Sequence, residues 1–360
     1  MLLRFCLKTA AFVVPLLLLF TFNWIYTCAD CGDLIRIGQL YTSNSVIPPV
    51  PLSSTTGTSF DYVHDNLLPS GFTKRYDVLV IGDSFSHQGK NGFTQFLGET
   101  GLSVTYVDSV ITGHEPVQTL HRLLAGDFFS TYSVDYVVLE TVGRSFLHRF
   151  SQPAPGLALT IDSLRMMDYE EVPNIKREET VLPPFFSYNT LEMPVRNYLY
   201  TNQDAPLNAK VYRTRLKSNI RLFNEEDYLL FFDEDLQKFD VGDMAKTFEK
   251  VKQTLHLLST KLAKHDVTLV LLICPDKYDL YHPYLANPTD YPLPFLNDSL
   301  QAIDKDFLFV SLIQPLQEAM INTTNLYAYG DTHWLPPAAK IAAREIYNTI
   351  IDHRTKVPEE

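Results

Sequence analysis

The residues best suited to chemistry are a serine in the first quarter of the chain and an acid–histidine pair near its end. Ser84 follows the short apolar run 77–81, while Asp331 and His333 stand two residues apart in a polar loop at 329–334. Serine is a weak nucleophile until a base takes its proton, and that base must be oriented by a third group. The three residues therefore predict Ser84 as the nucleophile, His333 as the proton relay and Asp331 as the group that orients His333.

Each motif also has a plainer interpretation. Serine and aspartate are ordinary residues of turns and helix N-caps, so Gly82-Asp83-Ser84 need not be catalytic. Asp-x-His can form a turn or half of a metal site, and a metal-dependent phosphohydrolase using Asp83, Asp331 and His333 is the alternative chemistry. At the start of a helix, however, the N–H of Ser84 would help to bind an oxyanion, because the first N–H groups of a helix lack intrahelical partners.

The elements that must position these residues alternate between apolar runs and helical patterns. Because such alternation is typical of a parallel sheet covered on both faces, we expect a three-layer α/β/α, flavodoxin-like sandwich with about five central strands. Catalytic groups of such sheets gather at the carboxyl ends of the strands. The predicted strands are 77–81, 104–110, 136–139, 267–274 and 307–312, and the predicted helices are 92–100, 116–125, 243–264, 315–321 and 336–351.

One stretch, at about 145–240, breaks the alternation. It is rich in Pro, Tyr, Phe and charged residues and shows no clear strand–helix unit. Segments of this size within a compact domain are usually functional or disordered. We expect an insertion in a catalytic domain at 76–355, forming a cap or a substrate surface; the alternative is an excursion that only covers the sheet.

The N-terminus carries a membrane signal. Arg4 and Lys8 precede the uncharged stretch 9–29, which is long enough to cross a bilayer as a helix with its basic flank in the cytoplasm. We therefore expect a single-pass signal anchor at 1–29 in the inner (cytoplasmic) membrane, a linker at 30–75, and the catalytic domain on the periplasmic or extracellular side. A cleaved signal peptide is the alternative.

Composition excludes some partners. The formal net charge of −12 argues against nucleic acid, which is bound through clustered Lys and Arg. No Cys/His group has zinc-site spacing, so the sequence predicts neither a metal nor a cofactor. Cys28 and Cys31, which lie close to the anchor, would form a local disulfide or remain two thiols.

The two motifs together resemble the first and last blocks of the SGNH (GDSL-type) hydrolase superfamily. In that resemblance Gly113 matches the glycine whose N–H serves the oxyanion hole, together with the N–H of Ser84. The block in which other members carry an asparagine reads Leu-Glu-Thr-Val-Gly-Arg at 139–144, with no asparagine. Arg144, with Thr141 behind it, is the candidate replacement donor. The alternative is a surface arginine paired with Glu140.

A narrower resemblance is to the alginate O-acetyltransferase (AlgX/AlgJ-like) branch. It rests on Asp-Thr-His-Trp at 331–334, on Cys-Pro-Asp-Lys at 274–277, and more loosely on the block around Glu140 and Arg144. In the alginate enzymes the Asp-x-His block precedes the serine block, whereas here the serine comes first. Blocks of the same kind are thus present in rotated order.

The resemblance implies a serine-dependent O-acetyltransferase that acts on an exported or cell-surface polysaccharide and receives its acyl group from a membrane-bound O-acyltransferase. It also implies substrate contacts from Lys277, Trp334, Tyr281 and Glu140. Lys277 would hold a sugar carboxylate or stay a solvated lysine, and Trp334 would stack on a sugar or pack over the His333 loop. Two other functions stay open: a carbohydrate esterase with the same site, and an inactive SGNH-fold binding or assembly protein.

Overall fold

The computed structural model describes residues 2–26, 32–38, 40, 58–63, 74–108, 113–166, 198, 210–224, 227–236 and 241–356. Its central feature is a parallel sheet of six strands in the order β1-β3-β2-β4-β7-β8. These strands are β1 (Asp61–Tyr62), β2 (Lys74–Gly82), β3 (Val104–Asp108), β4 (Tyr132–Val142), β7 (Thr268–Cys274) and β8 (Leu308–Val310). The five predicted strands are all present, and the two-residue β1 extends the sheet beside β3.

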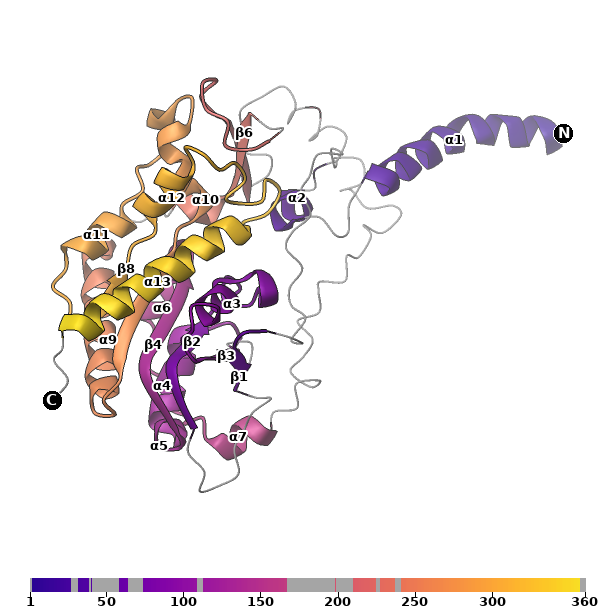
Figure 1. The fold of residues 1–360 in the computed structure, drawn as a ribbon. Helices are drawn as coiled ribbons and strands as arrows, with labels where there is room; N and C mark the ends of the chain where they lie inside the picture. The colour runs from indigo at the N-terminus through magenta and orange to yellow at the C-terminus, as the bar shows by residue number, and fades with distance from the viewer. Residues whose placement is uncertain are drawn as a thin grey trace.

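Helices cover both faces of the sheet, as predicted. Alternate residues of a strand point to opposite faces; in β2, Val78 and Val80 pack with one buried cluster and Leu79 and Ile81 with the other. The first face carries α3 (Phe93–Gly98) and α13 (Pro336–Lys356) (Figure 1). The second face carries α4 (Pro116–Ala125), α5 (Phe128–Thr131), α6 (Gly143–Ser151), α7 (Ile161–Met166) and α9 (Val241–Ala263).

The remaining helices of the second half lie between β7 and β8 or follow β8 in the chain. They are α10 (Lys277–Tyr281), η5 (His282–Tyr284), η6 (Pro288–Asp290), α11 (Leu296–Ala302) and α12 (Ile313–Ala319). Among the strands, the largest deviation from a predicted boundary is in β4, predicted only at 136–139. Ser133 and Asp135 interrupt the apolar pattern, yet Asp135 pairs with Arg354 at the surface while Val134 is buried. The strand is longer than its apolar run because residues 132–134 also pair with residues 74–76 of β2.

The segment predicted as a linker at 30–75 is partly built into the domain, so that prediction is corrected. Residues 33–38 form the short helix α2 (Asp33–Gly38), in which Leu34 and Ile35 are buried, and β1 pairs in parallel with β3. Two buried apolar residues within a polar stretch gave no periodic signal, so the sequence did not predict this helix. Cys28 and Cys31 lie outside the described residues.

The predicted insertion begins with α6 and α7 and continues to an antiparallel hairpin of β5 (Val211–Arg215) and β6 (Tyr228–Phe232), followed by η4 (Asp233–Leu236). Within the hairpin, Val211, Leu229 and Phe231 join the core cluster on the α13 side. Residues 167–197 and 199–209 lie outside the described part of the chain. The role of the insertion as a cap or substrate surface stays a prediction.

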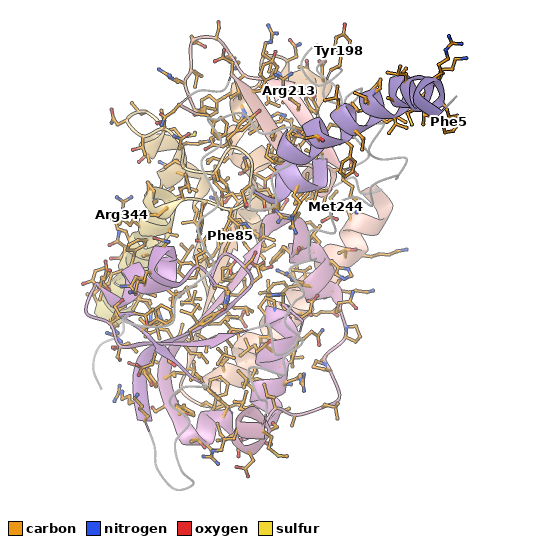
Figure 2. The ribbon with its side chains drawn as sticks, turned by 90° about the vertical axis from the view of Figure 1, so that its right-hand side faces the viewer. Phe5, Phe85, Tyr198, Arg213, Met244 and Arg344 are labelled. Carbon is orange, nitrogen blue, oxygen red and sulfur yellow. The ribbon has the colours of Figure 1, made fainter. Side chains whose placement is uncertain are left out.

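The N-terminal helix α1 (Leu2–Tyr26) extends away from the sheet (Figures 1 and 2). Its window Arg4–Thr21 has a mean hydropathy of 1.7 and is not buried, so by length and composition this helix can cross a membrane. Among the labelled side chains of Figure 2, Phe5 projects from α1 at the outside of the molecule, whereas Phe85 lies in its interior. The helix agrees with the predicted anchor, although a signal sequence would pass the same test.

Candidate active site

The serine loop leaves the sheet at the centre of its carboxyl edge. The next strand after β2, β3, pairs on one side of β2, and the following one, β4, pairs on the other. The strand order therefore reverses at β2, and open parallel sheets bind their ligands at such a point. A Cβ at Gly82 would lie 2.0 Å from Ser86 Oγ and 2.3 Å from Glu140 Oε2, so this turn requires glycine. Ser84 follows two residues later.

The structure brings the three predicted catalytic residues into contact. His333 Nε2 lies 2.7 Å from Ser84 Oγ, and His333 Nδ1 lies 2.6 Å from Asp331 Oδ1. Asp331 Oδ1 also accepts the backbone N–H of His333 at 2.9 Å. The His333 side chain keeps 24% of its surface exposed and Asp331 only 7%, so the base reaches solvent while its partner is buried. This is the relay geometry that activates a serine hydroxyl.

The charges of the pair support that arrangement. Burial opposes ionisation of Asp331, but the His333 ring and its hydrogen bonds outweigh burial and lower the pKa of Asp331 to about 2. Burial likewise opposes protonation of His333, yet the Asp331 carboxylate more than offsets it and raises the pKa of His333 above its ordinary value. Asp331 is therefore a carboxylate across the neutral range, and it stabilises the imidazolium that a proton transfer from Ser84 would create.

Asp83, the residue before Ser84, stabilises the serine loop through the hydrogen bonds of its carboxylate. Its Oδ1 accepts the N–H of Phe85 at 3.1 Å, and its Oδ2 accepts the N–H of Val142 at 2.9 Å and a bond from Arg149 on α6. Burial alone would raise the pKa of Asp83, but Arg149 holds it below its ordinary value. The predicted alternative of a metal set with Asp83 does not match, because the acid–histidine group that converges in the described residues contains Asp33 instead.

Glu140 was predicted to contact substrate, and the structure corrects this. The side chain is fully buried, and its Oε2 accepts the N–H of Asp83 at 2.9 Å and the hydroxyl of Ser86 at 2.7 Å. Burial and the nearby Asp83 raise the pKa of Glu140 well above its ordinary value, which favours the protonated, neutral carboxyl. Glu140 thus supports the serine loop from inside the protein.

A neutral Glu140 predicts different outcomes for two substitutions. Glu140→Gln keeps an acceptor for both donors without adding charge, so we expect the free energy of unfolding to change by less than about 1 kcal/mol. Glu140→Ala leaves the Asp83 N–H and the Ser86 hydroxyl without a partner and should lower it by about 2–4 kcal/mol. Urea denaturation of the purified protein measures both, and equal losses in the two variants would contradict the neutral state.

Lys277 was predicted either to bind a sugar carboxylate or to be solvated, and the structure shows neither. The side chain is 1% exposed, and its Nζ donates to the carbonyls of Ala328 at 2.8 Å and Tyr329 at 2.7 Å. These residues lead into the loop of Asp331 and His333. Lys277 therefore holds the Asp331–His333 loop in place. Burial lowers the pKa of Lys277 to about 7, although nearby carboxylates oppose this effect.

That pKa predicts a dependence of stability on pH. Below about pH 7 Lys277 is protonated in both the folded and the unfolded chain, so the cost of burying its charge is fully present. Between pH 7 and the ordinary lysine pKa of about 10.4, only the unfolded chain holds the proton, so stability rises with pH. In this range we expect the free energy of unfolding of the wild type to increase, relative to that of Lys277→Met, by roughly 1 kcal/mol per pH unit or less. If the free energies of unfolding of wild type and Lys277→Met, plotted against pH, run parallel from pH 7 to 10, the prediction is contradicted.

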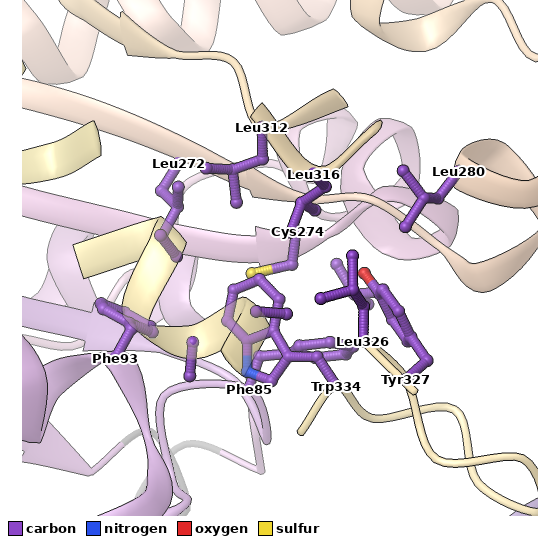
Figure 3. Packing of buried hydrophobic residues seen from close by; sticks show 14 of the residues in the cluster. Phe85, Phe93, Leu272, Cys274, Leu280, Leu312, Leu316, Leu326, Tyr327 and Trp334 are labelled. Atoms are coloured by element: carbon purple, nitrogen blue, oxygen red, sulfur yellow. The ribbon is translucent and has the colours of Figure 1, made fainter. Parts of the chain in front are cut away.

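Trp334 and Tyr281 were also predicted to touch substrate, and both lie in the core. Trp334 is fully buried, donates from Nε1 to Gln88 Oε1 at 2.8 Å, and packs edge-on against Phe85, as Figure 3 shows beside Cys274. Of the two predicted roles, stacking on a sugar and packing over the His333 loop, the structure supports a packing role for Trp334. Tyr281 is likewise fully buried, so neither ring can stack on a sugar in this arrangement.

The other predicted oxyanion-hole residues, Gly113 and Arg144, have no described hydrogen bond to Ser84 or His333. Gly113 is exposed, has a φ of 71°, and precedes α4 after residues 109–112, which lie outside the description. Arg144 donates from its backbone N–H to Asp276 Oδ2 at 2.6 Å and from Nη1 to Asp276 Oδ1 at 2.5 Å and Asp235 Oδ1 at 3.5 Å. The predicted alternative pairing with Glu140 is therefore wrong. Thr141 is fully buried and accepts a bond from Arg149 at 2.5 Å.

Several residues of the site escaped the sequence analysis because they act through long-range contacts. Arg149 and Asp235 lie in the stretch treated as an insertion, and Asp33 lies in the stretch treated as a linker. Asp276 belongs to the quoted Cys-Pro-Asp-Lys block, but its partner Arg144 is 132 positions away, so no local signal indicated this ion pair. For Asp33 the sequence held no signal, since its partner is about 300 positions away.

The fold and the site together define a three-layer α/β/α sandwich with a Ser-His-Asp group at the carboxyl edge of its parallel sheet, and part of this chain is similar to an SGNH-type family. Residues 224–359 match the family described as "SGNH hydrolase-like domain, acetyltransferase AlgX". A probable alginate O-acetylase AlgJ of Pseudomonas fluorescens is 28% identical over 143 residues, which cover 37% of this chain and 36% of that protein. The matched region thus spans little more than a third of the relative. These findings support an SGNH/AlgX-like family for this chain, and the family match contains Asp331 and His333 but not Ser84.

Proposed function

We propose that this protein is a serine-dependent O-acetyltransferase that acts on a cell-surface or exported polysaccharide. The observation that carries the proposal is the contact of Ser84 Oγ with His333 Nε2 at 2.7 Å, with Asp331 bound to the opposite ring nitrogen. The similarity of residues 224–359 to an acetyltransferase family favours an acetyl group as the transferred unit.

The chemistry follows from the triad. Ser84 Oγ attacks the carbonyl carbon of an acyl donor while His333 Nε2 takes the serine proton, and the same proton then goes to the departing group. A sugar hydroxyl attacks the resulting acyl-serine, gives its proton to His333, and leaves as the acetylated glycan while Ser84 recovers a proton. The N–H groups of Ser84 and Gly113 would stabilise the negative oxygen in each step, and Arg144 is the proposed third donor.

The location of the site supports an acyl donor at the membrane. Tyr26, at the end of α1, and Asp33, at the start of α2, are seven positions apart in the chain. A chain of that length reaches about 25 Å at most, and α2 contacts the loop of His333. If α1 is a single-pass anchor in the inner membrane, the site stays close to the bilayer on the periplasmic or extracellular side. A membrane-bound O-acyltransferase is the proposed donor partner.

The decisive experiment separates transfer from hydrolysis, because the same triad would serve an esterase. The full chain in detergent is incubated with a chromogenic acetyl ester, with and without a uronic-acid polysaccharide, and acetyl on the glycan is measured beside free acetate. Acetylated glycan that depends on Ser84 supports the proposal. Free acetate as the sole product with every acceptor would assign an esterase, and no acyl-enzyme with any ester would assign an inactive binding or assembly protein.

A further inference from the structure

The short helix α2 is bound directly to the loop that carries the acid and the base. The Asp33 carboxylate accepts two hydrogen bonds from Thr332, from its N–H at 2.8 Å and from its hydroxyl at 2.5 Å. In return the backbone N–H of Asp33 donates to Asp331 Oδ2 at 3.1 Å. The residue between the acid and the base is thus held by Asp33, and so is the acid itself.

The backbones around this contact touch as closely as the side chains. The N–H of Ile35 donates to the carbonyl of Gly330 at 3.2 Å. A Cβ at Gly32 would lie only 2.3 Å from that same carbonyl oxygen, so no larger residue fits without displacing the loop. Three consecutive residues of the loop, 330–332, therefore receive their supports from α2 and the glycine before it.

The charge of Asp33 also reaches the base. Both of its carboxylate oxygens accept hydrogen bonds from Thr332, which favours the ionised form, although burial and the nearby Asp331 raise the pKa of Asp33. Asp33 in turn contributes to the raised pKa of His333. The charged groups that act on this cluster from the surrounding elements are Asp33 from α2, Asp331 from the loop, Arg144 from α6 and Lys277 from α10.

We propose that Asp33 is a positioning residue of the active site, which holds the Asp331–His333 loop against Ser84 and adds a second negative charge that stabilises the His333 imidazolium. This inference rests on the proposed acyl transfer for its kinetic meaning, while its structural part does not. It makes the segment next to the N-terminal helix a functional part of the catalytic centre.

Two substitutions separate the charge of Asp33 from its hydrogen bonds. Asp33→Asn keeps an acceptor for the Thr332 N–H and can donate to the Thr332 hydroxyl, so the loop stays in place while the charge is lost. The pKa of His333 should then fall, because one of the negative charges that stabilise its imidazolium is lost. The acidic limb of the pH–rate profile for Ser84 acylation should therefore move to lower pH by about 0.5–1 unit. Asp33→Ala also frees the loop and should lower the acylation rate by about 10- to 100-fold.

The matched control is Asp162→Asn, which removes a carboxylate from the surface of α7, where Asp162 is 80% exposed and paired with Arg165. Asp162→Asn should change neither the position of the acidic limb of the pH–rate profile nor the acylation rate. His333 is also titrated by NMR in the full-length protein in detergent, which needs no activity. A purely structural role for Asp33 would leave this titration unchanged in Asp33→Asn.

The outcomes separate the two proposals. If wild type acylates but Asp33→Asn titrates like wild type and Asp33→Ala keeps the wild-type rate, the role of Asp33 is overturned. If wild type forms no acyl-enzyme with any acetyl ester while the His333 pKa still falls in Asp33→Asn, the proposed function fails and the charge coupling stands. Should Asp33→Ala fail to fold, the asparagine variant alone decides through its pH limb and its NMR titration.

Discussion

Ser84→Ala is expected to lower the rate of acetyl transfer by about 10⁴- to 10⁶-fold, the loss found when a serine nucleophile is removed from a triad. The reason is that no other hydroxyl occupies the position 2.7 Å from His333 Nε2 among the contacts described for that ring. The nearest serine in the sequence, Ser86, is buried and donates to Glu140. The activity that remains would come from binding and from the oxyanion donors.

The measurement is mass spectrometry of the protein after brief exposure to an acetyl ester, together with initial rates of acetyl release. Wild type should gain one acetyl group on the peptide that contains Ser84, and Ser84→Ala should gain none. Ser151→Ala is the matched control, since that half-buried residue ends α6 and, in the described part of the chain, its hydroxyl bonds the carbonyl of His148. A Ser84→Ala variant with the rate of this control would refute the nucleophile and favour a binding protein.

The strands and the catalytic pair were predictable because their signals are local. A continuous apolar run such as 78–81 is typical of a strand buried on both faces. Asp331 and His333 are only two positions apart in the sequence. The predicted site residues outside the triad fared differently. Lys277 and Trp334 have polar or aromatic tips that suit a sugar, yet both are buried.

Burial of those side chains could not be predicted, since it depends on what the rest of the chain packs around them. Lys277 is enclosed because the carbonyls of residues 328 and 329 turn toward it, and Trp334 because Gln88 offers it an acceptor. Each of these partners is more than 50 positions distant. The same holds for Asp33, whose two bonds to Thr332 cross almost the whole sequence.

The family match covers one part of the catalytic centre. The family match at 224–359 holds the acid, the base and Lys277, while the nucleophile comes from β2 near the other end of the chain. The two halves meet because β2 and β7 flank β4 in one parallel sheet, with their carboxyl ends at the same edge. The rotated order of the motifs therefore leaves their spatial relation compatible with a triad.

Asp331→Asn tests that centre without removing the nucleophile or the base. Asp331 Oδ1 accepts the N–H and Nδ1 of His333, and Oδ2 accepts the N–H of Asp33. An amide has one oxygen, so its NH₂ group must face a backbone N–H in either orientation. With NH₂ at the Oδ1 position, His333 Nδ1 becomes the acceptor and the ring proton moves to Nε2, where it prevents uptake of the Ser84 proton.

With NH₂ at the Oδ2 position the ring keeps its tautomer, but two donors oppose each other at Asp33 and the negative charge beside His333 is gone. Both orientations impair the base, so we expect the acylation rate to fall by about 10³- to 10⁴-fold, the range seen for this substitution in serine proteases. Because Asp331 raises the pKa of His333, the acidic limb of the residual rate should also move to lower pH. Acylation of Ser84 by a chromogenic acetyl ester from pH 5 to 9 measures both effects, and a rate above a tenth of wild type with an unmoved limb would show that Asp331 does not orient the base.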